Sequence, residues 1–253
     1  MTFLSTEASS IHAVNYSYLV FCNTLIRNSS TFNNFNFQNV IILEYAKFRK
    51  EKFVEYFQNA DINSFTDPAV KRKLKILKDI GTAALSDTEL TNLNAAKNRM
   101  STIYNRARIC PFAKQDCNLT SEGLTLDPDI ELLMASSENF DEMKWTWEQW
   151  HEKSGKLMRN DYKTYVDLMN KAAEANGHDD AGVMWRERYE DERLIEKVDE
   201  IWEEVKPLYD ELHKYVRYQM RDLYGEKIDK KSEFIPAHLL GNMWVSFKGK
   251  IKV

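Results

Sequence analysis

Five histidines are the side chains of this 253-residue sequence best suited to bind a metal or to transfer a proton at neutral pH. Two zinc-binding histidines on one helix are commonly four residues apart, and no two histidines here have that spacing. The stretch HEKSG at 151–155 begins like an HExxH motif but has Gly155 in place of the second histidine. The five are His12, His151, His178, His213 and His238. We therefore expect no metal, no cofactor and no catalytic residues within this chain.

Three cysteines allow one local disulfide. Cys110 and Cys117 are separated by six residues that include Pro111, a length that lets the two Cα atoms come within disulfide range. A metal site with Cys110 and Cys117 as two of its ligands is the alternative. It would need a second Cys or His pair at short spacing, and none is nearby. Cys22 has no evident partner and is interpreted as a small buried apolar residue or an odd thiol.

Three Asn-x-Ser/Thr sequons are candidate glycosylation sites, at Asn15, Asn28 and Asn118, although one such match can arise by chance. The sequon directly after Cys117 favours an exported ancestor. The first 30 residues nevertheless lack the basic start, continuous apolar core and cleavage site of a secretory signal, so we expect no signal peptide in the chain as given.

Composition excludes several classes of protein. With 43% hydrophobic and 12% aromatic residues, the chain can bury a sizeable core and is not expected to be disordered. The net charge of −4 disfavours binding to nucleic acid. No run of about 18 apolar residues is present, so no transmembrane segment is expected.

Helical patterns dominate, because glycine and proline are few and alternating β-branched runs are almost absent. Ser86 and Glu89 form a predicted capping box. The fold class is therefore all-α, with no substantial sheet. The predicted helices cover about 40–58, 68–83, 86–108, 128–137, 139–159, 161–176, 179–189, 191–224 and 236–244.

The helix predicted over 191–224 carries the clearest apolar stripe, and Gly225 is placed to end it. Its members recur every three or four residues, which favours ordinary core packing. They are Leu194, Val198, Ile201, Val205, Leu208, Leu212, Val216, Met220 and Leu223. The following helix, predicted over 236–244, is expected to bury Leu239, Leu240, Met243 and Trp244.

Four stretches resemble the amino-terminal half of the angiotensin-converting enzyme family, of the arthropod type. They are MKWTWEQWHEKSGKLM, YVDLMNKAAEANGHDDAGVMWRERYED, VKPLYDELHKYVRYQMRDLYG and IPAHLLGNMW, and the cysteine loop followed by LTLDPDIELLMASSENFDEMKW fits as well. The resemblance implies a partial helical peptidase domain over 41–244. Residues 1–40 match poorly. Residues 245–253 form a non-family tail, which we interpret as translated intron.

Members of that family are zinc peptidyl-dipeptidases, which remove carboxyl-terminal dipeptides from peptide substrates and are activated by chloride. The resemblance implies two helical halves around a channel, with the zinc motif HExxH beyond the position of GNMW. Because the sequence stops before that motif, we expect the chain to be inactive alone, and its exposed apolar faces to cause aggregation or recruit a partner. The alternatives are a short isoform acting as a peptide- or protein-binding decoy, and a helical interaction module unrelated to peptidases.

One family function maps onto this chain. DAGVMWRERYE resembles the family stretch whose arginine helps to hold chloride, which corresponds to Arg186 beside Trp185. The alternative is an ordinary ion pair of Arg186 with Glu187, Glu190 or Asp191. The aromatic cluster of Trp145, Trp147 and Trp150 is interpreted as core and domain packing rather than a cofactor site.

Overall fold

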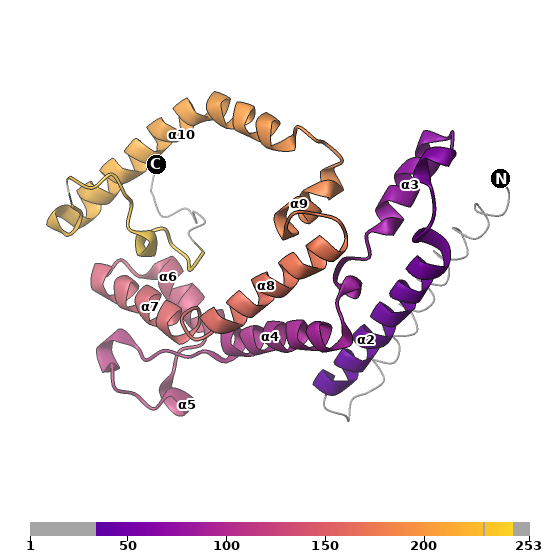
Figure 1. Ribbon diagram of the computed structural model, residues 1–253. Coiled ribbons are helices and arrows are strands. Elements are labelled where there is room, and N and C mark those ends of the chain that lie inside the picture. The colour runs from indigo at the N-terminus through magenta and orange to yellow at the C-terminus, as the bar shows by residue number, and fades with distance from the viewer. Residues whose placement is uncertain (1–33, 230, 245–253) are drawn as a thin grey trace. The chain divides into compact units, whose positions relative to one another are not determined.

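The structure is a computed structural model that describes residues 34–229 and 231–244. Asn15, Cys22, Asn28 and the tail 245–253 lie outside the described residues. Nine α-helices are present in the described ranges, and the only β-type pairing there is an isolated antiparallel bridge between Ile109 and Leu124. The all-α prediction is confirmed (Figure 1).

The α-helices carry the chain from one packed region to the next. They are α2 (Asn34–Lys52), α3 (Pro68–Lys78), α4 (Asp87–Arg106), α5 (Leu119–Glu122), α6 (Glu131–Ser136), α7 (Phe140–Lys153), α8 (Arg159–Ala175), α9 (Ala181–Arg186) and α10 (Leu194–Tyr224). Short 3₁₀ or π-helical turns cover Phe53–Phe57, Ile62–Ser64, Gly81–Ala84, Phe112–Lys114, Leu126–Ile130, Glu187–Tyr189, Gly225–Lys227 and Ala237–Leu239.

Two compact units make up the chain. The first contains the described residues up to Ala95 together with Val166–Met184, and the second contains Ala96–Tyr165 together with the described residues from Trp185 onward. The boundaries fall inside α4, α8 and α9, so the chain passes between the units along continuous helices. None of the described helices has an apolar stretch long enough to cross a membrane.

Within the first unit, Asn176 joins the end of α8 to the turn before α4. Its Oδ1 accepts from the backbone N–H of Ile80 at 2.8 Å, and its Nδ2 donates to the carbonyl of Gly81 at 2.9 Å. His178 lies 3.1 Å from the Asp79 carboxylate beside these bonds. Backbone groups in this turn therefore find partners almost 100 residues away in sequence, which fixes the turn against α8.

The predicted capping box at the start of α4 is confirmed. The backbone N–H of Ser86 donates to Glu89 at 3.0 Å, and the N–H of Glu89 donates to the Ser86 hydroxyl at 3.3 Å. Glu89 also pairs with Lys171 on α8. Lys171, and then Ser86, stabilise the charged carboxylate and lower the pKa of Glu89 to about 2.

In the second unit, α6, α7 and the end of α10 pack around one apolar core. Most of the buried side chains in this core are aliphatic or methionine, and α7 contributes the ring of Trp150. Tyr104 of α4 meets Trp150 edge-on at 5.6 Å between ring centroids. The buried members are Ile109, Ile130, Met134, Met143, Trp150, Val216, Met220, Ile228, Leu239 and Met243.

The apolar stripe of α10 is packed only at its carboxyl end. Val216 and Met220 are buried and Leu194 is partly buried, whereas the other six members are exposed, with Leu208 73% exposed. The prediction of ordinary core packing is therefore wrong for most of the stripe, because within the described residues no element covers this length of α10. Gly225, with a positive φ of 56°, ends the helix as predicted.

The helix predicted over 236–244 is also wrong, since only a single turn, Ala237–Leu239, is helical. Gly241 has a φ of 82°, which breaks the helical path, and the side chain of Asn242 accepts from the backbone N–H of Trp244 at 2.8 Å. Leu239 and Met243 are nevertheless buried, while Trp244 is exposed and donates to the Tyr104 hydroxyl at 3.0 Å. Apolar residues here mark a packed loop.

His238, in this loop, is a buried histidine against α7. Its ring meets Phe140 edge-on at 4.7 Å, and within the described residues its Nε2 has no hydrogen-bond partner. Loss of water around the ring, followed by repulsion from Lys144, lowers the pKa of His238 to about 4, against a smaller opposite effect of Asp141. The imidazole is therefore neutral in the folded chain at neutral pH.

We predict that His238 makes the second unit less stable in mild acid. The unfolded chain takes up a proton on His238 near its ordinary pKa of about 6.5, whereas the folded chain does so only near 4. The contribution is complete above pH about 6.5 and is lost as the pH falls toward 4, to a total of at most about 3 kcal/mol. Denaturant unfolding followed over this range should show a clearly smaller loss in His238→Gln than in the control His151→Gln, whose ring is exposed. Equal losses in the two variants would contradict the prediction.

Candidate functional site

The structure joins Cys110 and Cys117 in a disulfide, the pairing that the spacing favoured, with Cα atoms 5.6 Å apart. The backbone N–H of Cys117 also lies 3.2 Å from the Cys110 sulfur. The closed loop lies between α4 and α5 and contains the turn Phe112–Lys114. No metal site is needed to explain this cysteine pair.

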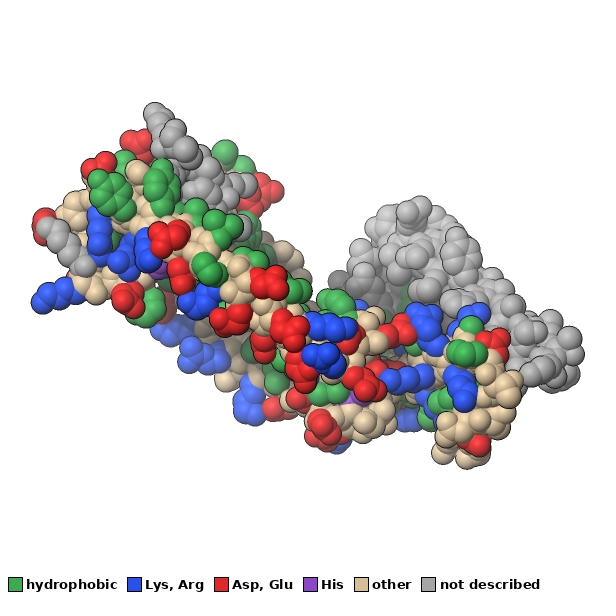
Figure 2. All heavy atoms as spheres, turned by 90° about the horizontal axis from the view of Figure 1, so that it is seen from above, with side chains coloured by type: hydrophobic (Ala, Val, Ile, Leu, Met, Phe, Trp, Pro, Cys, Tyr) green, Lys and Arg blue, Asp and Glu red, His purple; other side chains and the backbone are tan. Residues whose placement is uncertain are grey.

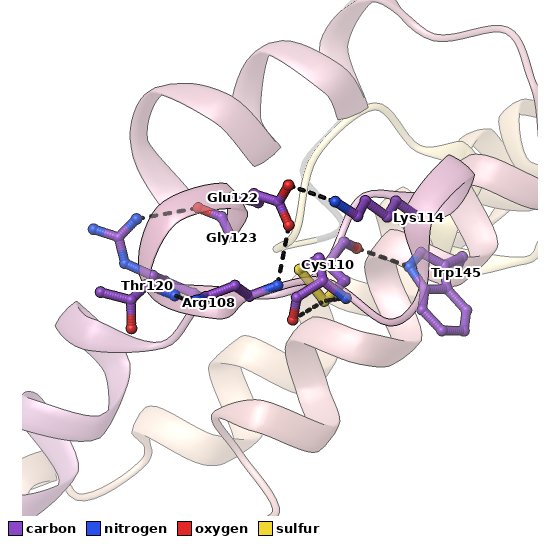
Figure 3. The surroundings of a disulfide bond; sticks show 9 residues. Arg108, Cys110, Lys114, Thr120, Glu122, Gly123 and Trp145 are labelled. Carbon is purple, nitrogen blue, oxygen red and sulfur yellow. Dashed lines mark hydrogen bonds and ion pairs between the residues drawn. A yellow bond between two sulfur atoms is a disulfide. The ribbon is translucent and has the colours of Figure 1, made fainter.

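Both ends of the disulfide loop are anchored by backbone hydrogen bonds. Ile109 and Leu124 exchange two bonds, at 3.2 Å and 2.8 Å, and the side chain of Ile109 is fully buried. Arg108 donates to the carbonyl of Gly123 at 3.1 Å. The indole N–H of Trp145 on α7 donates to the Cys110 carbonyl at 3.0 Å, so α7 holds the loop from the other side (Figure 3).

A carboxylate closes the far side of the loop. Glu122 accepts from Lys114 at 2.5 Å and from the backbone N–H of Asn118 at 3.1 Å (Figure 3). The bond from Lys114, and then that from Asn118, lower the pKa of Glu122 below its ordinary range. These contacts hold α5, a single helical turn, against the disulfide.

Gly123 is required where α5 ends. A Cβ atom at this position would lie 2.3 Å from the carbonyl oxygen of Leu119 and 3.0 Å from the Cβ of Arg108. Both neighbours belong to the fixed part of the loop, so no larger side chain fits without moving the backbone. The close approach of Arg108 and Gly123 therefore depends on the absence of a side chain.

The three tryptophans of α7 serve packing, as the sequence suggested. Trp150 is buried in the core, and Trp145 binds the Cys110 carbonyl. Trp147 lies over the ring of His151 with 3.9 Å between centroids. Each of the three rings thus has a structural contact.

Arg186 ends α9 and is half-buried, with no hydrogen bond or ion pair among the described residues. Of its three expected carboxylate partners, Asp191 instead accepts from Lys197 at 2.5 Å and from the backbone N–H of Arg193 at 3.0 Å. Trp185, beside it, is exposed. Asp191 is therefore not the ion-pair partner of Arg186.

The four histidines in the described part of the chain do not come together, and His12 lies outside it. His178 contacts Asp79 in the first unit, while the Nδ1–H of His151 donates to the carbonyl of Trp147 at 2.7 Å. His213 stacks on Tyr209 on α10, and His238 is buried behind Phe140. Over residues 34–229 and 231–244, no three His, Cys, Asp or Glu side chains are placed to hold a metal ion. These residues do not fit a zinc ion.

Sequence reasoning missed the environments of His178 and His238. A histidine inside an apolar run, as in IPAHLL, was a usable signal for burial of His238. No comparable local signal exists for His178, because its partner Asp79 is 99 residues away. The contact depends on how α8 returns to the turn at residues 79–81.

Comparison with known proteins agrees with the resemblance found in the motifs. The family model Peptidase_M2, described as angiotensin-converting enzyme, matches residues 3–252. This range overlaps both segments that we expected to match poorly or not at all, 1–40 and 245–253. The domain boundaries near residues 40 and 244 therefore stay a prediction.

Several curated relatives match over most of this chain. Angiotensin-converting enzyme of the leech Theromyzon tessulatum is 36% identical over 79% of the chain and 32% of its own length, and that of the fly Haematobia irritans exigua is 33% identical over 85% and 34%. The angiotensin-converting enzyme-like protein Ace3 of Mus musculus is 37% identical over 77% and 26%. The chain thus spans about a third or less of the length of these relatives. With its helical fold and a family match along nearly its whole length, the chain belongs to the angiotensin-converting enzyme family.

Proposed function

We propose that this chain is the helical amino-terminal part of a zinc peptidyl-dipeptidase, an enzyme that removes carboxyl-terminal dipeptides from peptide substrates. The observation that carries the proposal is the family match together with the span of about a third of the relatives' length. Because the described residues place no three metal ligands together, the zinc ligands and the general base are assigned to sequence outside this chain. Its own residues supply scaffold and binding surface.

The apolar face of α10 supports this assignment. We define this face by the exposed side chains Val198, Ile201, Val205, Leu208 and Leu212, which recur along one side of the helix. Figure 2 looks down on the molecule, from the side on which α10 lies at the top of Figure 1, and shows hydrophobic side chains interspersed with carboxylates. Such a continuous stripe normally lies against another element, so we assign the rest of the peptidase domain as its cover.

An extracellular or secreted location fits the same proposal. A disulfide persists in an oxidising compartment and is uncommon in the cytosol. The Cys110–Cys117 bond and the sequon that follows it are both properties of chains that pass through the secretory route.

A binding or decoy role is the second candidate. The same apolar face of α10 is the observation that favours it, because a chain without the rest of the domain would present this face to a partner or to another copy. The two candidate functions differ in whether the element that covers the apolar face of α10 belongs to the same polypeptide.

Arg186 is assigned to chloride binding in the longer enzyme. Its half-buried guanidinium has no carboxylate partner among the described residues, and an arginine stays charged at any physiological pH. Both properties suit an anion ligand, and the remaining ligands are assigned to the other part of the enzyme.

We predict that this chain alone binds no stoichiometric zinc and releases no dipeptide from a model peptide. A longer chain with a downstream HExxH motif should bind about one zinc ion and hydrolyse the same peptide. Elemental analysis after dialysis and chromatography of the peptide products measure the two effects. Chelator-sensitive hydrolysis by the short chain, with about one zinc bound per molecule, would overturn the assignment.

We predict that Leu208→Gln has different effects in this chain alone and in a longer chain that contains the rest of the peptidase domain. In the short chain this exposed position should change the free energy of unfolding by less than about 0.5 kcal/mol and reduce the binding of a hydrophobic dye. In the longer chain, where Leu208 is covered, it should destabilise by about 1.5 to 3 kcal/mol.

Glu203→Gln, also on α10 but outside the apolar face, is the matched control and should have little effect in either chain. If the short chain is a monomer that binds no dye, the apolar face is not available and the argument from α10 fails.

We predict that Arg186→Gln weakens the chloride dependence of hydrolysis in the longer chain, because it removes the fixed positive charge that would hold the anion. Arg188→Gln, two residues away on an exposed turn, is the control that keeps this dependence. Hydrolysis rates across a chloride titration distinguish the two variants. Indistinguishable titration curves would rule out the role of Arg186.

A further inference from the structure

One of the three sequons lies on the disulfide loop, in a defined position at the surface. Asn118 follows Cys117 directly, and both Asn118 and Thr120 are exposed. The middle residue is Leu119, so no proline blocks the sequon. The loop is held by the pairing of Ile109 with Leu124 and by the ion pair of Lys114 with Glu122.

The hydrogen bonds of Asn118 leave its amide nitrogen available. Its Oδ1 accepts from the backbone N–H of Thr120 at 3.0 Å, which makes Asn118 the N-cap of α5. Its own backbone N–H donates to Glu122 at 3.1 Å. In the described part of the chain, neither Asn118 Nδ2 nor the Thr120 hydroxyl makes a hydrogen bond, so the two groups that define an N-glycosylation acceptor are both unengaged and exposed.

We propose that Asn118 carries an N-linked glycan. In the transfer, a bond forms between Nδ2 of Asn118 and the anomeric carbon of a lipid-diphosphate-linked oligosaccharide. The bond from that carbon to the diphosphate oxygen breaks, the lipid diphosphate leaves with the electron pair, and one Nδ2 proton is lost to a base. The proposal rests on the secreted location assigned under the proposed function.

The folded loop tolerates this modification. A glycosylated asparagine keeps its carbonyl oxygen, so the bond from Thr120 N–H to Oδ1 and the cap of α5 are retained. The glycan itself projects from an exposed side chain rather than from a packed one. Asn118 therefore combines two roles that use different atoms of one amide, capping through Oδ1 and attachment through Nδ2.

The structure provides a pair of variants that separates the two roles. Thr120→Ala removes the acceptor hydroxyl, and Thr120→Ser keeps it. Both retain Asn118 and the backbone N–H of residue 120, so the cap is unchanged in each. Any difference between the variants in modification at Asn118 therefore reports the sequon and not the stability of α5.

The test is site occupancy in the full 253-residue chain, secreted from eukaryotic cells behind a cleavable leader. After the Cys110–Cys117 disulfide is reduced and alkylated, trypsin releases residues 115–144 as one peptide, in which Asn118 is the only sequon asparagine and Asn139 reports spontaneous deamidation. Glycosidase treatment in heavy-oxygen water converts a glycosylated Asn118 to labelled aspartate, which mass spectrometry detects. We expect the label in the parent chain and in Thr120→Ser, and its loss in Thr120→Ala.

Secreted parent protein whose peptide is wholly unlabelled at residue 118 would overturn the proposal, and so would a label that persists in Thr120→Ala. Occupancy does not depend on zinc or on hydrolysis. A failure at Asn118 is therefore distinguishable from a failure of the peptidase assignment, which is read separately from the activity of the longer chain.

Discussion

The pairing of Ile109 with Leu124 is the interaction on which the organisation of the second unit depends. Helices satisfy their own backbone groups, but the segment that leaves α4 does not, and a buried strand-like segment must find partners. Ile109 finds them in Leu124 while its side chain fills the core. The neighbouring carbonyl of Cys110 then binds Trp145, which links the disulfide loop to α7.

Asn176 has the equivalent role in the first unit, since one side-chain amide satisfies the backbone at Ile80 and Gly81. In both units, a few backbone hydrogen bonds outside the long helices fix how those helices pack. The sequence of a helix does not by itself specify which element it packs against. The apolar face of α10 is the exception, because nothing among the described residues covers it. This uncovered face supports the proposed assignment of the chain to a larger enzyme, which rests on the family match.

Several parts of the fold and of the site followed from local sequence. The apolar repeat and Gly225 predicted the extent of α10, and Ser86 with Glu89 predicted the cap of α4. The stretch IPAHLLGNMW misled, because its apolar residues suggested a buried helix, whereas Gly241 and Asn242 turn the backbone into a packed loop. Of the carboxylates considered as partners of Arg186, Asp191 bonds to Lys197 and Arg193 instead.

The sequence by itself determined the helical class, the local disulfide between Cys110 and Cys117, and membership of the family, because periodicity, short spacing and motif order are properties of neighbouring residues. Only the tertiary structure decided that the ring of His238 packs against Phe140 of α7 and that most of the α10 stripe faces water. These properties depend on which distant segments remove water from a side chain or bond to it, and no local pattern specifies that.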